Sequence, residues 1–168
     1  MVTQTNILVD AGGRARVAGF GVTSIPSAAP RVEVDTFFHG AAPELIDPQR
    51  FRLTNARATA ATDVYAFGVL AFEVSEGLLV FEFSSKMDQV FAGRVPFHDK
   101  GNAAGVYSMF EGRRPGRPVH PELTDCVWKM IRRCWNGNPA RRHTMVEVVA
   151  VLEAEANAHK FRYAVLST

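Results

Sequence analysis

The sequence predicts a mainly α-helical domain, in which a short N-terminal β-hairpin precedes about five or six helices packed around one buried central helix. Three observations support this prediction. A long apolar stretch occupies the middle of the chain, strand-like patterns are confined to its beginning, and helical patterns fill its second half. Because strands come first and do not alternate with helices, a Rossmann-type parallel sheet is not expected.

The stretch from Ala58 to Glu76 is predicted to form the buried central helix. It carries no charged residue between positions 64 and 72, and its apolar side chains fall on all sides, which is typical of a helix surrounded by protein. Thr62 or Asp63 stands where an N-cap is expected, and Gly77 marks the predicted end. The run is shorter than the roughly 20 apolar residues of a membrane span, so a core helix is favoured.

Composition and charge narrow the class of protein. A chain of 168 residues with 47% hydrophobic residues and 21% charged residues is expected to form one ordinary soluble domain. A net charge of +2 does not favour a nucleic-acid or membrane surface as partner. Cys126 and Cys134 fall in one predicted helix and are expected to be buried free thiols. The start of the chain does not resemble a secretory signal, so we expect an intracellular, cytoplasmic protein.

The elements before the central helix are predicted from short patterns. Residues 6–10 and 14–18 are strand-like and flank a glycine-containing turn, which predicts a tight hairpin. Residues 22–41 show no period and are expected to form a loop. Residues 42–46 resemble one helical turn with a proline near its start.

Three further helices are predicted after the central one. A short helix is expected at residues 102–111, an amphipathic helix at residues 121–135, and a last helix that opens at a capping box formed by Thr144 and Glu147. The side chains expected to face inward on the first and last of these helices are Val106, Met109, Phe110, Val148, Val149 and Leu152.

A series of short motifs is similar to the C-terminal lobe of protein kinases, most closely to the tyrosine-kinase-like group. Before the central helix, Asn6-Ile7-Leu8-Val9 resembles the end of the catalytic loop, Ala18-Gly19-Phe20-Gly21 stands at the Asp-Phe-Gly position, and Ala42-Pro43-Glu44 matches Ala-Pro-Glu. In the central helix, Asp63-Val64-Tyr65-Ala66-Phe67-Gly68 resembles Asp-Val-Trp/Tyr-Ser-Phe-Gly. After it, Gly112-Arg113-Arg114-Pro115 resembles the proline-rich connector, and Cys134-Trp135 followed by Pro139 to Thr144 resembles the last signature of the group. Their order and spacing over residues 6–152 imply a partial kinase domain at residues 1–156, with a tail at 157–168 and the central helix as helix F.

The resemblance implies ATP and Mg²⁺ as cofactors, and it also identifies what the chain lacks. Asn6 matches the Mg²⁺-binding Asn of the family, although a polar residue capping the turn before a strand is an equal alternative. Met1 stands where the family has its proton-accepting Asp. Gly19 replaces the metal-binding Asp before Phe20 and Gly21, and since Mg²⁺ prefers carboxylate and phosphate oxygens, this change should remove most of the metal affinity.

Other residues of the chain match family residues that have structural roles. Glu44, next to Ala42 and Pro43, and Arg142 resemble the ion pair that ties the Ala-Pro-Glu turn to the connector before the last helix. Asp63 resembles the residue that binds the catalytic-loop backbone, with a plain N-cap as the alternative.

The basic cluster Arg113, Arg114 and Arg117 is interpreted as a solvated connector in preference to a phosphate site.

Residues 75–90 are expected to be an insertion relative to the family. The family passes from this helix into a short turn, whereas here an apolar segment intervenes. We interpret it as a retained intervening sequence of the gene or, if it is genuine, as an apolar surface for a partner.

Two functions follow from the resemblance. The first is an inactive, pseudokinase-like binding or scaffold module, or a truncated product, with protein partners and no nucleic acid or membrane. The alternative is a protein Ser/Thr or Tyr kinase that transfers the γ-phosphate of ATP to protein hydroxyls when an N-terminal half is supplied.

Overall fold

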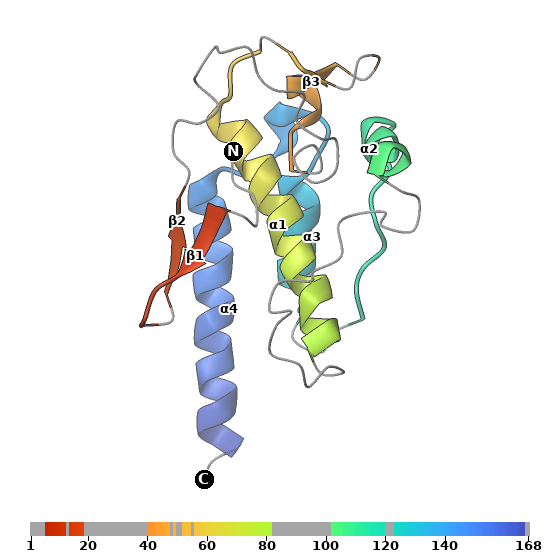
Figure 1. Cartoon of the computed structure of the whole chain (residues 1–168). Coiled ribbons are helices and arrows are strands. Elements are labelled where there is room, and N and C mark those ends of the chain that lie inside the picture. Colours follow the sequence, from red (N-terminus) through yellow and green to blue (C-terminus); the bar gives the residue numbers. More distant parts are fainter. Residues whose placement is uncertain are drawn as a thin grey trace.

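The computed structural model describes residues 6–12, 14–18, 40–47, 49, 52–54, 56–81, 102–119 and 123–166. Within them the chain is mainly helical, as predicted, with two small antiparallel sheets of two strands each (Figure 1). The elements in chain order are β1 (Ile7–Val9), β2 (Ala15–Val17), the 3-10 turn η3 (Pro43–Leu45), β3 (Ile46–Asp47), β4 (Arg52–Leu53), α1 (Ala60–Phe81), α2 (Asn102–Phe110), α3 (Asp125–Cys134), the 3-10 turn η5 (Pro139–Arg141) and α4 (Met145–Leu166).

The core lies where α1 packs against α3, and α4 also packs against α3 (Figure 1). Trp135 is its largest fully buried side chain, with the ring of Phe72 at 5.2 Å and that of Trp128 at 6.0 Å in an edge-on arrangement. Other buried members of this core are Val64, Tyr65, Val69, Leu123, Met130, Ile131, Cys134 and Val148.

Gly68 marks the closest approach between α1 and α3. A Cβ atom at this position would lie 2.7 Å from Cβ of Cys134 and 3.0 Å from the backbone nitrogen of Trp135. Both neighbours belong to rigid main chain or to the first side-chain atom, so neither can rotate away. The glycine is therefore what allows the two helices to pack at this distance.

The two ends of α1 differ from the prediction. The N-cap is Thr59, because its hydroxyl accepts from the backbone N–H of Thr62 (3.3 Å) while the Thr62 hydroxyl accepts from the backbone N–H of Thr59 (2.9 Å). The prediction of Thr62 or Asp63 as N-cap was wrong, since this reciprocal pair starts the helix earlier. The helix also continues through Gly77 to Phe81, where a single glycine costs only about 1 kcal/mol.

The predicted insertion therefore begins inside a helix. Residues 75–81 extend α1, whereas residues 82–90 lie outside the described residues.

The hairpin and the short helical turn are confirmed. β1 and β2 pair with Ile7 opposite Val17, and η3 begins at Pro43. The structure also shows a second hairpin, β3–β4, that the sequence patterns did not reveal.

The third and fourth helices confirm the predicted elements but correct their boundaries and faces. α3 begins at Asp125, later than predicted, because the hydroxyl of Thr124 accepts from the backbone N–H of Val127 at 3.3 Å. Cys134 is buried as expected, but Cys126 is exposed and this prediction was wrong.

The capping box of α4 is confirmed, with the backbone N–H of Thr144 donating to the Glu147 carboxylate at 2.7 Å. Val148 faces the core, yet Val149 and Leu152 are 45% and 37% exposed, so their inward assignment was wrong. Among the described side chains of α4, those of Val148 and Val151 contact the core.

No helix among the described residues combines the length and the apolarity needed to cross a bilayer.

Candidate functional site

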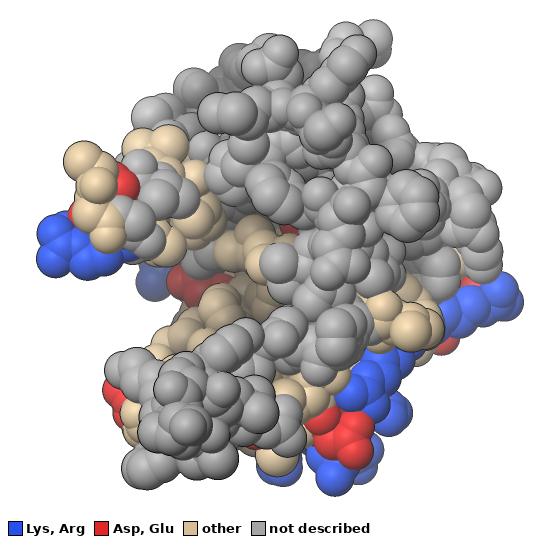
Figure 2. Space-filling model, turned by 90° about the horizontal axis from the view of Figure 1, so that it is seen from below, with Lys and Arg blue, Asp and Glu red and all other residues tan. Residues whose placement is uncertain are grey.

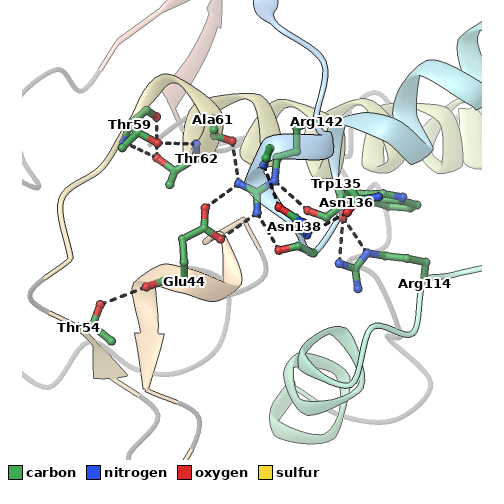
Figure 3. Close-up of polar contacts among 12 residues, drawn as sticks. Glu44, Thr54, Thr59, Ala61, Thr62, Arg114, Trp135, Asn136, Asn138 and Arg142 are labelled. Carbon is green, nitrogen blue, oxygen red and sulfur yellow. Dashed lines mark hydrogen bonds and ion pairs between the residues drawn. The ribbon is translucent and has the colours of Figure 1, made fainter.

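A buried arginine joins parts of the chain that are far apart in sequence. Arg142, just after η5, has a side chain with no exposed surface, and its two terminal nitrogens donate to the two carboxylate oxygens of Glu44 at 2.7 and 2.8 Å (Figure 3). This two-pronged geometry is the strongest form of an arginine–carboxylate contact. The structure thus brings together the pair that the sequence resemblance had suggested.

The remaining N–H groups of Arg142 reach backbone carbonyls. Its Nε donates to Asn136 at 2.8 Å and its Nη1 to Ala61 at 2.8 Å, while Nη2 lies 3.5 Å from the carbonyl of Gly137 (Figure 3). A buried charge is costly unless it is paired and hydrogen-bonded, and here both conditions are met. Arg142 therefore connects η3, the first turn of α1 and the segment before η5.

Tyr65 lies beside this network. Its ring centroid is 4.9 Å from the guanidinium carbon of Arg142 and 5.8 Å from that of Arg114, distances suited to cation–π attraction. Burial raises the pKa of Tyr65 to about 12, because the loss of solvent disfavours the phenolate more strongly than the two guanidinium groups favour it. The Tyr65 side chain is thus neutral, and its ring contacts the guanidinium groups of both arginines.

The basic cluster of the connector is bound within the protein. Arg114 donates from Nε and Nη2 to the carbonyl of Trp135 at 3.0 and 2.9 Å, and from Nη1 to that of Met109 at 2.8 Å. Arg117 is paired with Asp125, and Arg113 with Glu111.

This arrangement supports the structural interpretation over a phosphate site. Seen from below, described side chains of opposite charge lie beside one another at the edges of the molecule (Figure 2). Sequence reasoning missed the role of Arg114, which donates to the carbonyl of Trp135 at the C-terminal end of α3 from a segment distant in sequence.

The positions that correspond to kinase catalytic residues are only partly described. Asn6 directly precedes β1, and its backbone carbonyl accepts from the N–H of Ala18 at 2.7 Å. Asp63 lies in the first turn of α1. Met1 and the Gly19-Phe20-Gly21 segment lie outside the described residues.

Among the described residues, the carboxylate of the hairpin does not fit a Mg²⁺ site. Asp10 is the carboxylate nearest in sequence to Asn6, but its Oδ1 accepts from the backbone N–H groups of Gly12 and Arg14, and its Oδ2 from the side chains of Arg14 and Arg16. The backbone bond from Arg14 and the Arg16 guanidinium hold the pKa of Asp10 below its ordinary value. In the described part of the chain, no group of three or more His, Cys, Asp or Glu side chains is placed to hold a metal ion.

The Glu44 carboxyl gives the network a dependence on pH. Partial burial acts to raise the pKa of Glu44, but the hydrogen bonds and charge of Arg142 outweigh it and hold the pKa below its ordinary value of 4.5. The unfolded chain then binds a proton more readily than the folded one. The stability that comes from the ionised carboxylate is complete above the ordinary pKa and is lost as the pH falls through the folded-state pKa.

We therefore expect the Glu44→Gln variant to be less stable than the wild type at neutral pH, and this difference to shrink below about pH 4. Urea denaturation of both proteins between pH 7 and pH 3 measures the difference directly. A gap that stays constant over this range would show that the ionised pair is not its source.

The buried ion pair and the mainly helical fold are compatible with a kinase-like domain, and comparison with known proteins identifies the family. The chain belongs to the protein tyrosine and serine/threonine kinase family, whose model matches residues 2–152. It is similar to the dual serine/threonine and tyrosine protein kinase of Apis mellifera, with 28% identity over 152 residues that cover 89% of this chain and 14% of that protein. Two Arabidopsis thaliana proteins are also similar.

The first of these is serine/threonine/tyrosine-protein kinase HT1, 26% identical over 88% of this chain and 32% of its own length. The second is the LRR receptor-like serine/threonine-protein kinase FEI 2, 32% identical over 92% of this chain and 25% of its own length. The chain thus spans between 14% and 32% of the curated relatives named here.

Proposed function

We propose that this chain is a kinase C-terminal lobe that acts by binding other proteins and does not transfer phosphate. The observation that carries the proposal is Gly19, which stands where the family has its metal-binding aspartate. Glycine has no side-chain ligand, and kinase catalysis relies on Mg²⁺ to neutralise the charge on the phosphates.

The described oxygen donors of the hairpin do not compensate for this loss. Asp10 is fully engaged in the hairpin turn, and Asn6 alone offers a neutral amide. Mg²⁺ demands near-octahedral oxygen coordination and is usually held by one or two carboxylates together with phosphate oxygens. By contrast, the Glu44–Arg142 pair is complete, so the chain keeps a feature that supports a folded lobe.

Calorimetric titration with Mg²⁺–ATP tests the proposal. We expect no saturable binding by the wild-type chain at nucleotide concentrations up to about 1 mM, the upper end of ordinary substrate affinities. The matched comparison is Gly19→Asp, which restores the missing carboxylate and should bind at least as well as the wild type. Micromolar binding by the wild type would contradict the proposal.

The alternative function is protein phosphorylation by a longer protein that contains this lobe. The names of the similar proteins, all serine/threonine or tyrosine kinases, favour it. In that protein the γ-phosphate of ATP would pass to a protein hydroxyl, and Gly19→Asp should raise the rate strongly. Equal and substantial phosphate transfer by the two forms would show that position 19 is not the metal site.

A further inference from the structure

We propose that α4 binds a second copy of this chain, with the two α4 helices antiparallel. The exposed face of α4 carries a row of apolar residues. Met145, Val149 and Leu152 are spaced four and three residues apart and are 40%, 45% and 37% exposed, and Ala156 continues the same row as an exposed residue. This is the a/d spacing of a coiled coil, and on such a helix an apolar row faces another helix.

The spacing of this row continues in the sequence toward the C-terminal end of α4. Positions 159, 163 and 166 keep the same alternating spacing and are His, Tyr and Leu in the sequence, and the helix extends through Leu166. The kinase family model matches residues 2–152, and residues 153–166 of α4 follow the matched stretch. Figure 1 shows the C-terminal end of α4 extending past the ends of α1 and α3.

The charged residues that flank the row favour a second copy of this chain as the partner that binds it. In this heptad pattern Glu153 occupies an e position and Glu155 a g position. The sequence has Lys160 and Arg162 at the next e and g positions. In an antiparallel pair of identical helices, e meets e and g meets g. Residue 153 of one copy therefore lies opposite 160 of the other, and 155 lies opposite 162.

The same alignment also pairs the a positions with the d positions, all of them apolar except His159 and the polar hydroxyl of Tyr163. It sets 149 opposite 166, 152 opposite 163, and 156 opposite 159, so every layer combines an a position with a d position. The two-fold axis repeats each charge pair, which gives attraction on both sides of the seam. A parallel pair would instead bring Glu155 against Lys160 and leave residue 153 without a charged partner.

The overlap from residue 149 to residue 166 is about 27 Å long at 1.5 Å per residue. Because this length holds fewer than the three to four heptads of a strong coiled coil, we expect a reversible dimer with a dissociation constant in roughly the micromolar range. The proposal does not depend on nucleotide binding.

Sedimentation velocity of the full 168-residue chain over a range of concentrations tests the proposal. We expect a monomer–dimer equilibrium for the wild type. Glu153→Lys places like charges opposite each other twice and should weaken self-association at least about tenfold, as should Lys160→Glu. The double variant Glu153→Lys/Lys160→Glu restores opposite charges with reversed signs and should regain the wild-type equilibrium.

Asn157→Lys is the matched control, since it adds a charge to the same helix at position b, away from the seam, and should leave association unchanged. A wild-type chain that stays monomeric at about 100 μM, well above the expected dissociation constant, would overturn the proposal. So would a dimer that tolerates Glu153→Lys, which would indicate parallel pairing or another surface. Circular dichroism of each variant verifies that the helix content is preserved.

Discussion

Replacing Arg142 by alanine is expected to lower the free energy of unfolding by about 3–5 kcal/mol, the usual cost of removing one partner from a buried ion pair. The substitution leaves the Glu44 carboxylate without its cation. It also removes donors from the carbonyls of Asn136 and Ala61, which accept from this guanidinium at 2.8 Å each. A loss of this size is a large part of the stability of an ordinary domain, so the variant should be partly unfolded at physiological temperature.

Urea denaturation followed by circular dichroism measures this effect. Arg141→Ala is the matched control, because Arg141 is the preceding arginine in the chain and is exposed, and its replacement should change stability by less than about 0.5 kcal/mol. Arg142→Lys should also be strongly destabilised, since an ammonium group cannot supply the planar, two-pronged contact to Glu44. If Arg142→Ala cost no more than Arg141→Ala, the network would not be holding these segments together.

The second large effect is expected at Gly68. Alanine normally stabilises a helix interior by about 1 kcal/mol relative to glycine. Here the added methyl would lie 2.7 Å from Cβ of Cys134, so α1 and α3 must move apart across the centre of the core. Overpacking of this kind typically costs about 1–3 kcal/mol, and we expect Gly68→Ala to be destabilised by roughly 2 kcal/mol.

Thermal and urea denaturation of Gly68→Ala, compared with Gly116→Ala, separates packing from backbone effects. A Cβ atom at Gly116 meets no atom within 4 Å, so that variant should be close to the wild type. A Gly68→Ala protein that is more stable than the wild type would mean that helix propensity outweighs the contact between the helices.

The features that were predicted from sequence are those set by neighbouring residues. The hairpin follows from a short alternating pattern around a glycine turn, and the α4 cap from one threonine and a glutamate three residues later. The start of α1 was missed because Thr59, Thr62 and Asp63 are all good caps, and the reciprocal bonds between the two threonines decide among them. The end of α1 was missed because Gly77 was interpreted as a helix end, whereas the apolar helix continues through it to Phe81.

Contacts over long sequence distances were harder to predict. Glu44 and Arg142 are 98 residues apart, and only the family resemblance suggested that they meet. Arg114 reaches the carbonyl of Trp135, a backbone acceptor that every residue type provides, so no sequence pattern marks it. The exposure of Cys126 and Val149 depends on how much of α3 and α4 other elements cover, which periodicity alone does not reveal.

The choice of acceptors around Arg142 bears on how this protein tolerates sequence change. Among the described residues that accept hydrogen bonds from its guanidinium, only Glu44 uses its side chain; Ala61, Asn136 and Gly137 use the main chain. A carbonyl remains in place when its side chain is exchanged, provided that the backbone keeps its path. The network is therefore specified by two side chains, so the identities of the other contributing residues can drift over evolution while the connection they make persists.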